Sequence, residues 1–422
     1  MGWLFFLQFS KSLYSGIILI IMKKYWLVPF IFVFVLMVFF ISGRGVKTGH
    51  HFFVPLAQGF LKGRLYVDKM EYALHEMIPE QEIATGVYSE LVDGAYGKYY
   101  VIYPPLPAVI LMPAIAIWGE LTNQSVISMI IAALSVVISF LVFLKVTSDE
   151  NKALWLTALY AFGSMLWYHS VVGSAWYFSM ICALLFLWLA ILATLHKKSL
   201  FLIGLLIGLA YLCRFSIILS FPFFLYLTKD QWLKSGSFKI KPLIYFALAL
   251  SIAVGISLSY NWTRYHRLGH YGYTLLEKRP YNINNEYSEG SYSLSYVSRN
   301  LEAMFKSYPN KTESFPYLLP NNTSMALWIV MPALLLIIFA PVKDPITKAS
   351  WLAVIFTLPA SLLHGGIGAS QFGYRYALDY MPFLLLLIAL AVKSRFELWK
   401  KLLFVVSIAV NLWGVWSAFW IK

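Results

Sequence analysis

The chain has 422 residues, of which 60% are hydrophobic, 18% are aromatic and only 12% are charged. Soluble domains carry about 25% charged residues, so this composition excludes an ordinary soluble domain and indicates a helical protein that crosses a membrane several times. The formal net charge of +14 does not indicate nucleic acid, because the Lys/Arg excess lies in short loops between apolar segments, as the positive-inside rule expects.

The N-terminal part predicts one span behind a short extension. Residues 1–24 form the extension, and its first 21 residues are expected to be an upstream segment or an interfacial helix. The first span covers about Tyr25–Ser42, with Lys23 and Lys24 on its cytoplasmic side.

A long polar stretch follows and is interpreted as the first outer loop, residues 43–124. Within it, residues 105–119 are apolar but short and contain Pro107 and Pro113, so they predict an interfacial or re-entrant helix rather than a span. This choice places all of the later Lys/Arg-rich loops inside: 197–198, 229–241, 343–348 and 393–401.

The rest of the chain predicts further spans and a second long outer loop, residues 261–323. With the first span there are about 11, so the fold class is an all-α, polytopic transmembrane bundle forming a single membrane domain, residues 1–422, with its N-terminus cytoplasmic. Polar segments gather outside, which predicts an active site on the extracytoplasmic face. The later spans cover about 125–146, 153–168, 174–195, 199–213, 215–228, 242–260, 324–341, 351–364, 380–392 and 402–420.

Two acids of the first outer loop are candidate general bases, because a carboxylate is the usual group that activates a hydroxyl. Asp93 ranks first and Asp68 second, and either could instead be a turn-forming residue. Lys98 could bind a phosphate or extend its stem to the interface, and Tyr103 could belong to a sugar platform or an aromatic belt.

Two arginines in apolar surroundings are candidate phosphate ligands. Arg214 interrupts about 30 apolar residues, and such a charge usually marks a site or a buried pair. Arg375 lies in a glycine-rich segment together with His364, Gln371 and Asp379, which are further candidates for substrate binding. Arg375 and Asp379 are four positions apart, so on an α-helix they would share a face and could simply pair.

Three stretches resemble the GT-C superfamily of integral membrane glycosyltransferases, nearest to the bacterial family 39 type, which is similar to protein O-mannosyltransferases and to the aminoarabinose transferase of lipid A. They read FFVPLAQGFLKGRL, DGAYGKYYVIYPPLPAVILMP and SQFGYRYALDYMPFLLLL. The resemblance implies transfer of a sugar from a polyprenyl-phosphate lipid on the extracytoplasmic side, with a carboxylate base soon after the first span. That position here reads Thr48-Gly49-His50-His51, so the base is expected at Asp93 or Asp68, or else His50 or His51 replaces it.

The leading hypothesis is therefore a glycosyltransferase that uses a polyprenyl-phosphate-linked sugar, with a glycan, lipid or protein as acceptor and membrane lipids as surroundings. No cofactor follows from the sequence: Cys182 and Cys213 form no metal-ligand pattern, and a divalent metal stays open. A flippase or transporter is the alternative, although its polar groups would lie in mid-membrane, and a non-catalytic envelope-assembly protein is the third reading.

Overall fold

The computed structural model describes residues 27–44, 49–69, 77–87, 94–234, 237–269, 271–277 and 287–420. The predicted N-terminal extension, residues 1–24, and the candidate base Asp93 lie outside these ranges.

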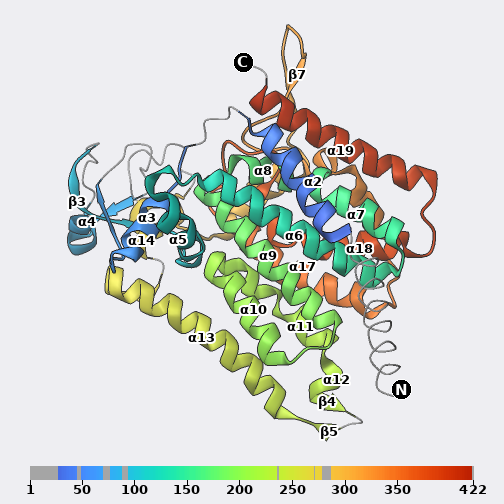
Figure 1. Ribbon diagram of the computed structural model, residues 1–422, viewed down its shortest axis with the longest axis horizontal. Coiled ribbons are helices and arrows are strands. Elements are labelled where there is room, and N and C mark those ends of the chain that lie inside the picture. Colours follow the sequence, from blue (N-terminus) through green and yellow to red (C-terminus); the bar gives the residue numbers. More distant parts are fainter. Residues whose placement is uncertain are drawn as a thin grey trace, which may run out of the picture.

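Five helices in the described ranges are long and apolar enough to cross a membrane. Of the most apolar 18 residues in each helix, 67% are buried in two of the five. Only 28% are buried in α13 (Ile240–Tyr265) and 33% in α19 (Leu398–Phe419), and these two helices lie along opposite edges of the bundle (Figure 1). This agrees with the prediction of a multi-pass helical protein. The five are α6 (Gln124–Thr147), α9 (Ala175–Leu195), α13 (Ile240–Tyr265), α17 (Pro345–Leu362) and α19 (Leu398–Phe419).

Several other predicted spans are shorter or divided. The predicted span 153–168 is two helices, α7 (Glu150–Phe162) and α8 (Leu166–Val172), and 324–341 is α16 (Leu327–Val330) followed by η5 (Pro332–Phe339). Pro332 has no backbone N–H to donate, which explains the second interruption. The remaining apolar helices are α2 (Leu27–Ser42), α5 (Leu106–Trp118), α10 (Leu200–Cys213), η3 (Phe215–Ser220), α11 (Phe221–Leu227) and α18 (Met381–Lys393).

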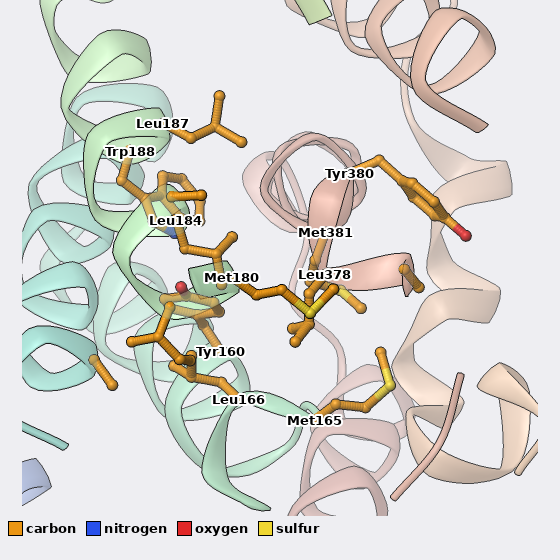
Figure 2. Packing of buried hydrophobic residues seen from close by; sticks show 14 of the residues in the cluster. Tyr160, Met165, Leu166, Met180, Leu184, Leu187, Trp188, Leu378, Tyr380 and Met381 are labelled. Atoms are coloured by element: carbon orange, nitrogen blue, oxygen red, sulfur yellow. The ribbon is translucent and has the colours of Figure 1, made fainter. Parts of the chain in front are cut away.

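One part of the hydrophobic core lies between α9 and the start of α18. All α18 residues from Met381 to Val392 are buried, so this helix is covered by protein on every side. Figure 2 shows Met180 and Leu184 of α9 directed toward Leu378 and Met381, which lie at the junction of η6 (Arg375–Asp379) and α18. This packing fixes the segment that precedes α18.

The first outer loop contains strands as well as helices, which corrects the all-α prediction. An antiparallel sheet has the order β1-β3-β2, with Val67 opposite Tyr99 and Met77 opposite Val101. Its strands are β1 (Val67–Lys69), β2 (Met77–Pro79) and β3 (Tyr96–Val101); two hairpins elsewhere are β4 (Leu233–Lys234) with β5 (Ser237–Phe238) and β6 (Asn310–Lys311) with β7 (Leu318–Leu319).

Short helices complete the loops at both ends of the bundle. The sheet, α3, α4 and α14 gather where α13 ends, while α12, β4 and β5 lie where α13 begins (Figure 1). The short elements are α3 (Phe53–Leu61), α4 (Glu80–Thr85), η2 (Gly119–Leu121), α12 (Lys229–Trp232), α14 (Tyr271–Glu277), η4 (Leu294–Tyr296) and α15 (Val297–Phe305).

Helix α13 is held to the bundle by a close seam with α10. A Cβ added at Gly204 would lie 2.8 Å from the carbonyl oxygen of Phe246, and one at Gly208 would lie 2.8 Å from the Cβ of Ala253. At its far end, the buried Arg264 donates to the carbonyl of Val101 in β3 and, over 2.9 Å, to the side-chain oxygen of Asn261. The helix therefore ties the sheet of the first loop to α10.

Candidate functional site

The candidate site lies at one end of the bundle, where the segment between α17 and α18 meets α9 and the junction of α10 with η3. This segment carries four of the residues singled out from the sequence: His364, Gln371, Arg375 and Asp379. The fifth, Arg214, ends α10 with extended backbone because the helix stops at Cys213. The structure thus brings together five candidates from distant parts of the chain.

Arg214 and Asp379 form a buried ion pair. The Nε atom of Arg214 lies 2.9 and 3.0 Å from the two carboxylate oxygens, and the Ser216 hydroxyl donates to one of them over 2.6 Å. The side chains are 22% and 6% exposed. The pairing of Arg375 with Asp379 considered from the sequence is wrong. Residues 375–379 form a 3₁₀ helix with about three residues per turn, so positions four apart do not share a face.

Among the described residues, Arg375 has no such counter-ion. It is 9% exposed, and no carboxylate in the described ranges lies within 4.0 Å of it. Its guanidinium donates over 3.4 Å to the carbonyl of Ala369 and to the hydroxyl of Tyr376. The rings of Trp176, Tyr177 and Tyr376 lie 5.8, 5.7 and 5.1 Å from its central carbon. A buried cation held by rings and long hydrogen bonds is a ready site for an anion.

The loop around Arg375 is fastened to its neighbours. The hydroxyls of Tyr168 and Tyr177 both donate to the carbonyl of Ser370, over 3.1 and 2.6 Å. Gly368 has φ +94°, and a Cβ there would lie 2.7 Å from Oε1 of Gln371 and 3.0 Å from Cζ of Arg375. Glycine at this position is therefore required both by the backbone and by the close approach of these two side chains.

Gln371 connects this loop with the second outer loop. Its backbone N–H donates to the carbonyl of Asn322 over 3.0 Å, and its Nε2 donates to the carbonyls of Thr323 and Ile367. Its Oε1 is buried and has no hydrogen-bond partner among the described residues. Gln371 thus has a structural contact and, beside Arg375, one acceptor that a ligand hydroxyl could use.

His364 lies among rings and arginines. Its ring centroid is 5.3 Å from that of Tyr376. The pKa of His364 is lowered to about 4, mainly by burial and also by the nearby guanidiniums of Arg214, Arg375 and Arg299, against an opposing hydrogen bond to the carbonyl of Gly366. Asn300 fixes the backbone here by donating to the carbonyl of His364 over 2.9 Å. His364 is therefore neutral at pH 7.

The first outer loop brings His50 to this site. Its carbonyl accepts a hydrogen bond of 2.9 Å from the N–H of Ala175, the first residue of α9, and its ring lies 4.9 Å from Trp176. His51 points to α6, where its Nε2 is 3.3 Å from the Ser125 hydroxyl. Burial and the neighbouring His50 lower the pKa of His51 to about 4.

Three other candidates make their contacts on the sheet side of the loop. Asp68 pairs with Arg64 at 2.5 Å, and Lys98 pairs with Glu80 at 2.8 Å, all four side chains being more than 40% exposed. Tyr103 is 4% exposed, and its ring packs against Phe52, Phe53 and Tyr273. None of these contacts involves Arg214 or Arg375. Tyr103 is thus a core residue here rather than an open platform.

Sequence reasoning missed the aromatic residues around Arg375. Trp176 and Tyr177 follow a polar turn, residues 168–174, between two predicted spans, and this position was the signal that could have found them. Ser216 and Asn300 gave no signal, because a serine in an apolar segment and an asparagine in a polar loop are both commonplace. In the described ranges, no group of three or more His, Cys, Asp or Glu side chains comes together as metal ligands.

No family model and no curated protein matches the sequence. Among solved structures, the chain is similar to the Archaeoglobus fulgidus oligosaccharyltransferase, crystallised with a tethered acceptor peptide that contains the NVT sequon. The two share 13% identity with a TM-score of 0.46, and the alignment covers 93% of this chain and 56% of that one. The chain therefore spans little more than half the length of that protein, and a similarity this low says nothing about the reaction.

Proposed function

We propose that the protein is a membrane glycosyltransferase that takes a sugar from a polyprenyl-phosphate lipid and transfers it to an acceptor at the extracytoplasmic face. The observation that carries this proposal is Arg375, a buried guanidinium surrounded by aromatic rings and without a carboxylate among the described residues. A guanidinium binds a phosphate through two parallel hydrogen bonds, which is the geometry that a lipid phosphate offers. The three stretches that resemble the GT-C superfamily support the same reaction class.

The two arginines have different roles in this proposal. Arg375 holds the donor phosphate and stabilises the negative charge that collects on it as the sugar leaves. Arg214 is already neutralised by Asp379, and it keeps η6 against α10 so that Arg375 stays in place. The rings of Trp176 and Tyr376 offer flat apolar surfaces for the sugar, and Oε1 of Gln371 offers an acceptor for one of its hydroxyls.

The transfer needs a proton acceptor as well as a phosphate site. The bond between the anomeric carbon and the phosphate oxygen breaks, and its electron pair leaves with polyprenyl phosphate. A bond forms between the same carbon and the acceptor oxygen, whose proton passes to a base. The proximity of His50 to Trp176 supports His50 as this base over the exposed, paired Asp68. Asp93 stays a candidate that only a variant can test.

The proposed topology has about 11 crossings with the N-terminus in the cytoplasm. In this topology the shorter apolar helices, such as α10 with 14 residues and α18 with 13, also cross the membrane. The Lys/Arg-rich segments near α12, β4 and β5 lie at the opposite end of α13 from the sheet of the first loop (Figure 1). This separation supports placing the site outside.

Donor binding by Arg375 variants tests the proposal. Purified protein in lipid nanodiscs is titrated with a polyprenyl phosphate. Arg375→Ala should weaken binding by about one to two decades, since a hydrogen-bonded contact to a charged group contributes about 1.5–3 kcal/mol. Arg375→Lys should recover only part of this, because lysine lacks the planar fork.

The matched control is Arg395→Ala, the same change at an exposed arginine outside the site, which should leave affinity unaltered. An unchanged affinity of Arg375→Ala for the polyprenyl phosphate would contradict the proposed phosphate site. Tight donor binding without transfer to any glycan, lipid or peptide acceptor would instead favour a transporter or a scaffold.

A further inference from the structure

A hairpin in the second outer loop exposes aromatic side chains on an ordered turn. Strands β6 and β7 pair with Asn310 opposite Leu319, and the N–H of Thr312 donates to the carbonyl of Tyr317 over 3.0 Å. The N–H of Tyr317 donates to the carbonyl of Ser314 over 2.8 Å. Phe315 is nevertheless 73% exposed and Tyr317 is 61% exposed. Backbone hydrogen bonds thus hold the turn in place, while its two large aromatic side chains are exposed.

The tip of this hairpin touches the outer edge of α19. The ring of Phe315 lies 6.1 Å from that of Trp416. Trp416 belongs to a row of exposed apolar residues along α19, together with Leu402, Val405 and Leu412. Helix α19 is one of the five described helices long and apolar enough to cross a membrane, and only 33% of its most apolar 18 residues are buried. In a bilayer this row would therefore face the acyl chains.

The hairpin lies where this row ends. It projects from the bundle beside the C-terminal end of α19 (Figure 1). A second exposed aromatic pair, Tyr308 and Trp328, lies at the base of the hairpin with ring centroids 6.3 Å apart. Tryptophan and tyrosine concentrate at the boundary between acyl chains and headgroups, because their rings are apolar and their N–H or O–H groups need water.

We infer that the β6–β7 hairpin is an interfacial anchor, which inserts Phe315 and Tyr317 into the headgroup boundary of the lipid leaflet next to α19. The partner is the bilayer itself, since the hairpin tip continues a surface that already faces lipid. Glu313, which is exposed on the same turn, stays in water.

This anchor has a consequence for the neighbouring site. A few residues after β7, the carbonyls of Asn322 and Thr323 accept the hydrogen bonds of Gln371. A hairpin fixed in the membrane surface therefore keeps the second outer loop, beside Gln371 and Arg375, at a constant depth relative to the bilayer. The anchor does not depend on which reaction the site performs.

Spin-label accessibility tests the inference without any activity measurement. Nitroxide labels are placed at Phe315→Cys and Tyr317→Cys, with Glu313→Cys as the control on the same turn. The protein is reconstituted at high lipid ratio into vesicles of phosphatidylcholine and phosphatidylglycerol. The native Cys182 and Cys213 are buried, and the wild-type protein serves as the labelling blank.

In an anchor, labels at 315 and 317 are more accessible to oxygen, which partitions into lipid, than to a water-soluble nickel chelate, and the label at 313 shows the reverse. Nickel access at 315 and 317 equal to that at 313 would place the tip in water and overturn the inference. Exclusion of both reagents would overturn it too, because a second copy or another protein would then cover the tip.

Discussion

At the scale of single residues, the two arginines of the site differ in what already neutralises them. Arg214 shares Asp379 with Ser216, whereas Arg375 has no carboxylate among the described residues. Removing one partner of a buried pair leaves the other charge uncompensated. We therefore expect Arg214→Ala to lower the free energy of unfolding by about 3–5 kcal/mol.

Arg375→Ala removes a charge that no carboxylate among the described residues balances, so it should cost less stability than Arg214→Ala. Unfolding of both variants in the same detergent, without donor, provides the measurement. The double variant Arg214→Met with Asp379→Leu should lose less stability than Arg214→Ala, because it leaves no lone buried charge. Equal losses for Arg214→Ala and Arg375→Ala would show that the two arginines are both structural.

The lowered pKa of His364 gives a stability that depends on pH. In the unfolded chain this histidine has its ordinary pKa of about 6.5, whereas in the folded protein its pKa is about 4. Between these values the unfolded state binds the extra proton, so stability falls as pH drops from about 6.5 to 4. His364→Asn should flatten that part of the thermal-unfolding profile, and His196→Asn, at an exposed histidine, is the control. A profile equally steep in both variants would assign the slope to other groups.

The proposed base can be tested without disturbing the backbone. His50 has φ +63°, a conformation that asparagine tolerates better than most residues, so His50→Asn removes the imidazole at little conformational cost. We expect turnover to fall by about 10²-fold or more with donor affinity retained. Asp68→Asn should be close to normal because Asp68 is paired and exposed. Normal turnover in His50→Asn together with loss in Asp93→Asn would move the base to Asp93.

At the scale of elements, the contact of α10 with α13 depends on glycine. In Gly204→Ala, the new methyl group would lie 2.8 Å from a backbone oxygen of α13, so the helices must separate. We expect a loss of about 1–3 kcal/mol, as for other overpacked contacts. Gly255→Ala in α13 is the matched control, because nothing lies within 4 Å of its added Cβ and alanine favours a helix. Thermal unfolding of the two variants tests this expectation. Equal stability of Gly204→Ala and Gly255→Ala would mean that the contact between α10 and α13 has room for the added methyl group.

Local geometry explains which features of the site the sequence could predict. The convergence of Arg214, His364 and Arg375 followed from their polar character in apolar surroundings, since such residues must share a cavity or a partner. The partner of Asp379 did not follow, because residues 375–379 form a 3₁₀ helix and the spacing rule of the α-helix fails there.

The sheet of the first outer loop was missed for a different reason. Strand β3 carries aromatic residues with burial that changes halfway, exposed at Tyr96 and buried at Val101, so it shows no alternation along the strand. The ion pair of Lys98 with Glu80 depends on that sheet and joins residues far apart in sequence. Lys98 could therefore be read as a phosphate ligand from the sequence, whereas the fold gives it a carboxylate.

At the scale of the whole molecule, the topology predicts which loops a membrane-impermeant thiol reagent reaches in intact cells. Cysteines at Glu80 and Glu289, which lie in the two proposed outer loops, should react, and one at the exposed Lys239 should not. Labelling after permeabilisation provides the control for reactivity at Lys239. Reaction at Lys239 without reaction at Glu80 would reverse the orientation and with it the face on which the site works.

The charge of Arg375, which no carboxylate in the described part of the chain balances, also determines how the purified protein will behave in the laboratory. A ligand that binds only the folded state adds to its stability in proportion to the logarithm of its concentration above Kd. Detergent extraction removes native lipids. The preparation from which most lipid has been removed should therefore keep its folded protein for the shortest time in storage. Adding a polyprenyl phosphate to the extraction buffer should lengthen that lifetime for the wild type and lengthen it less for Arg375→Ala, which binds the lipid more weakly.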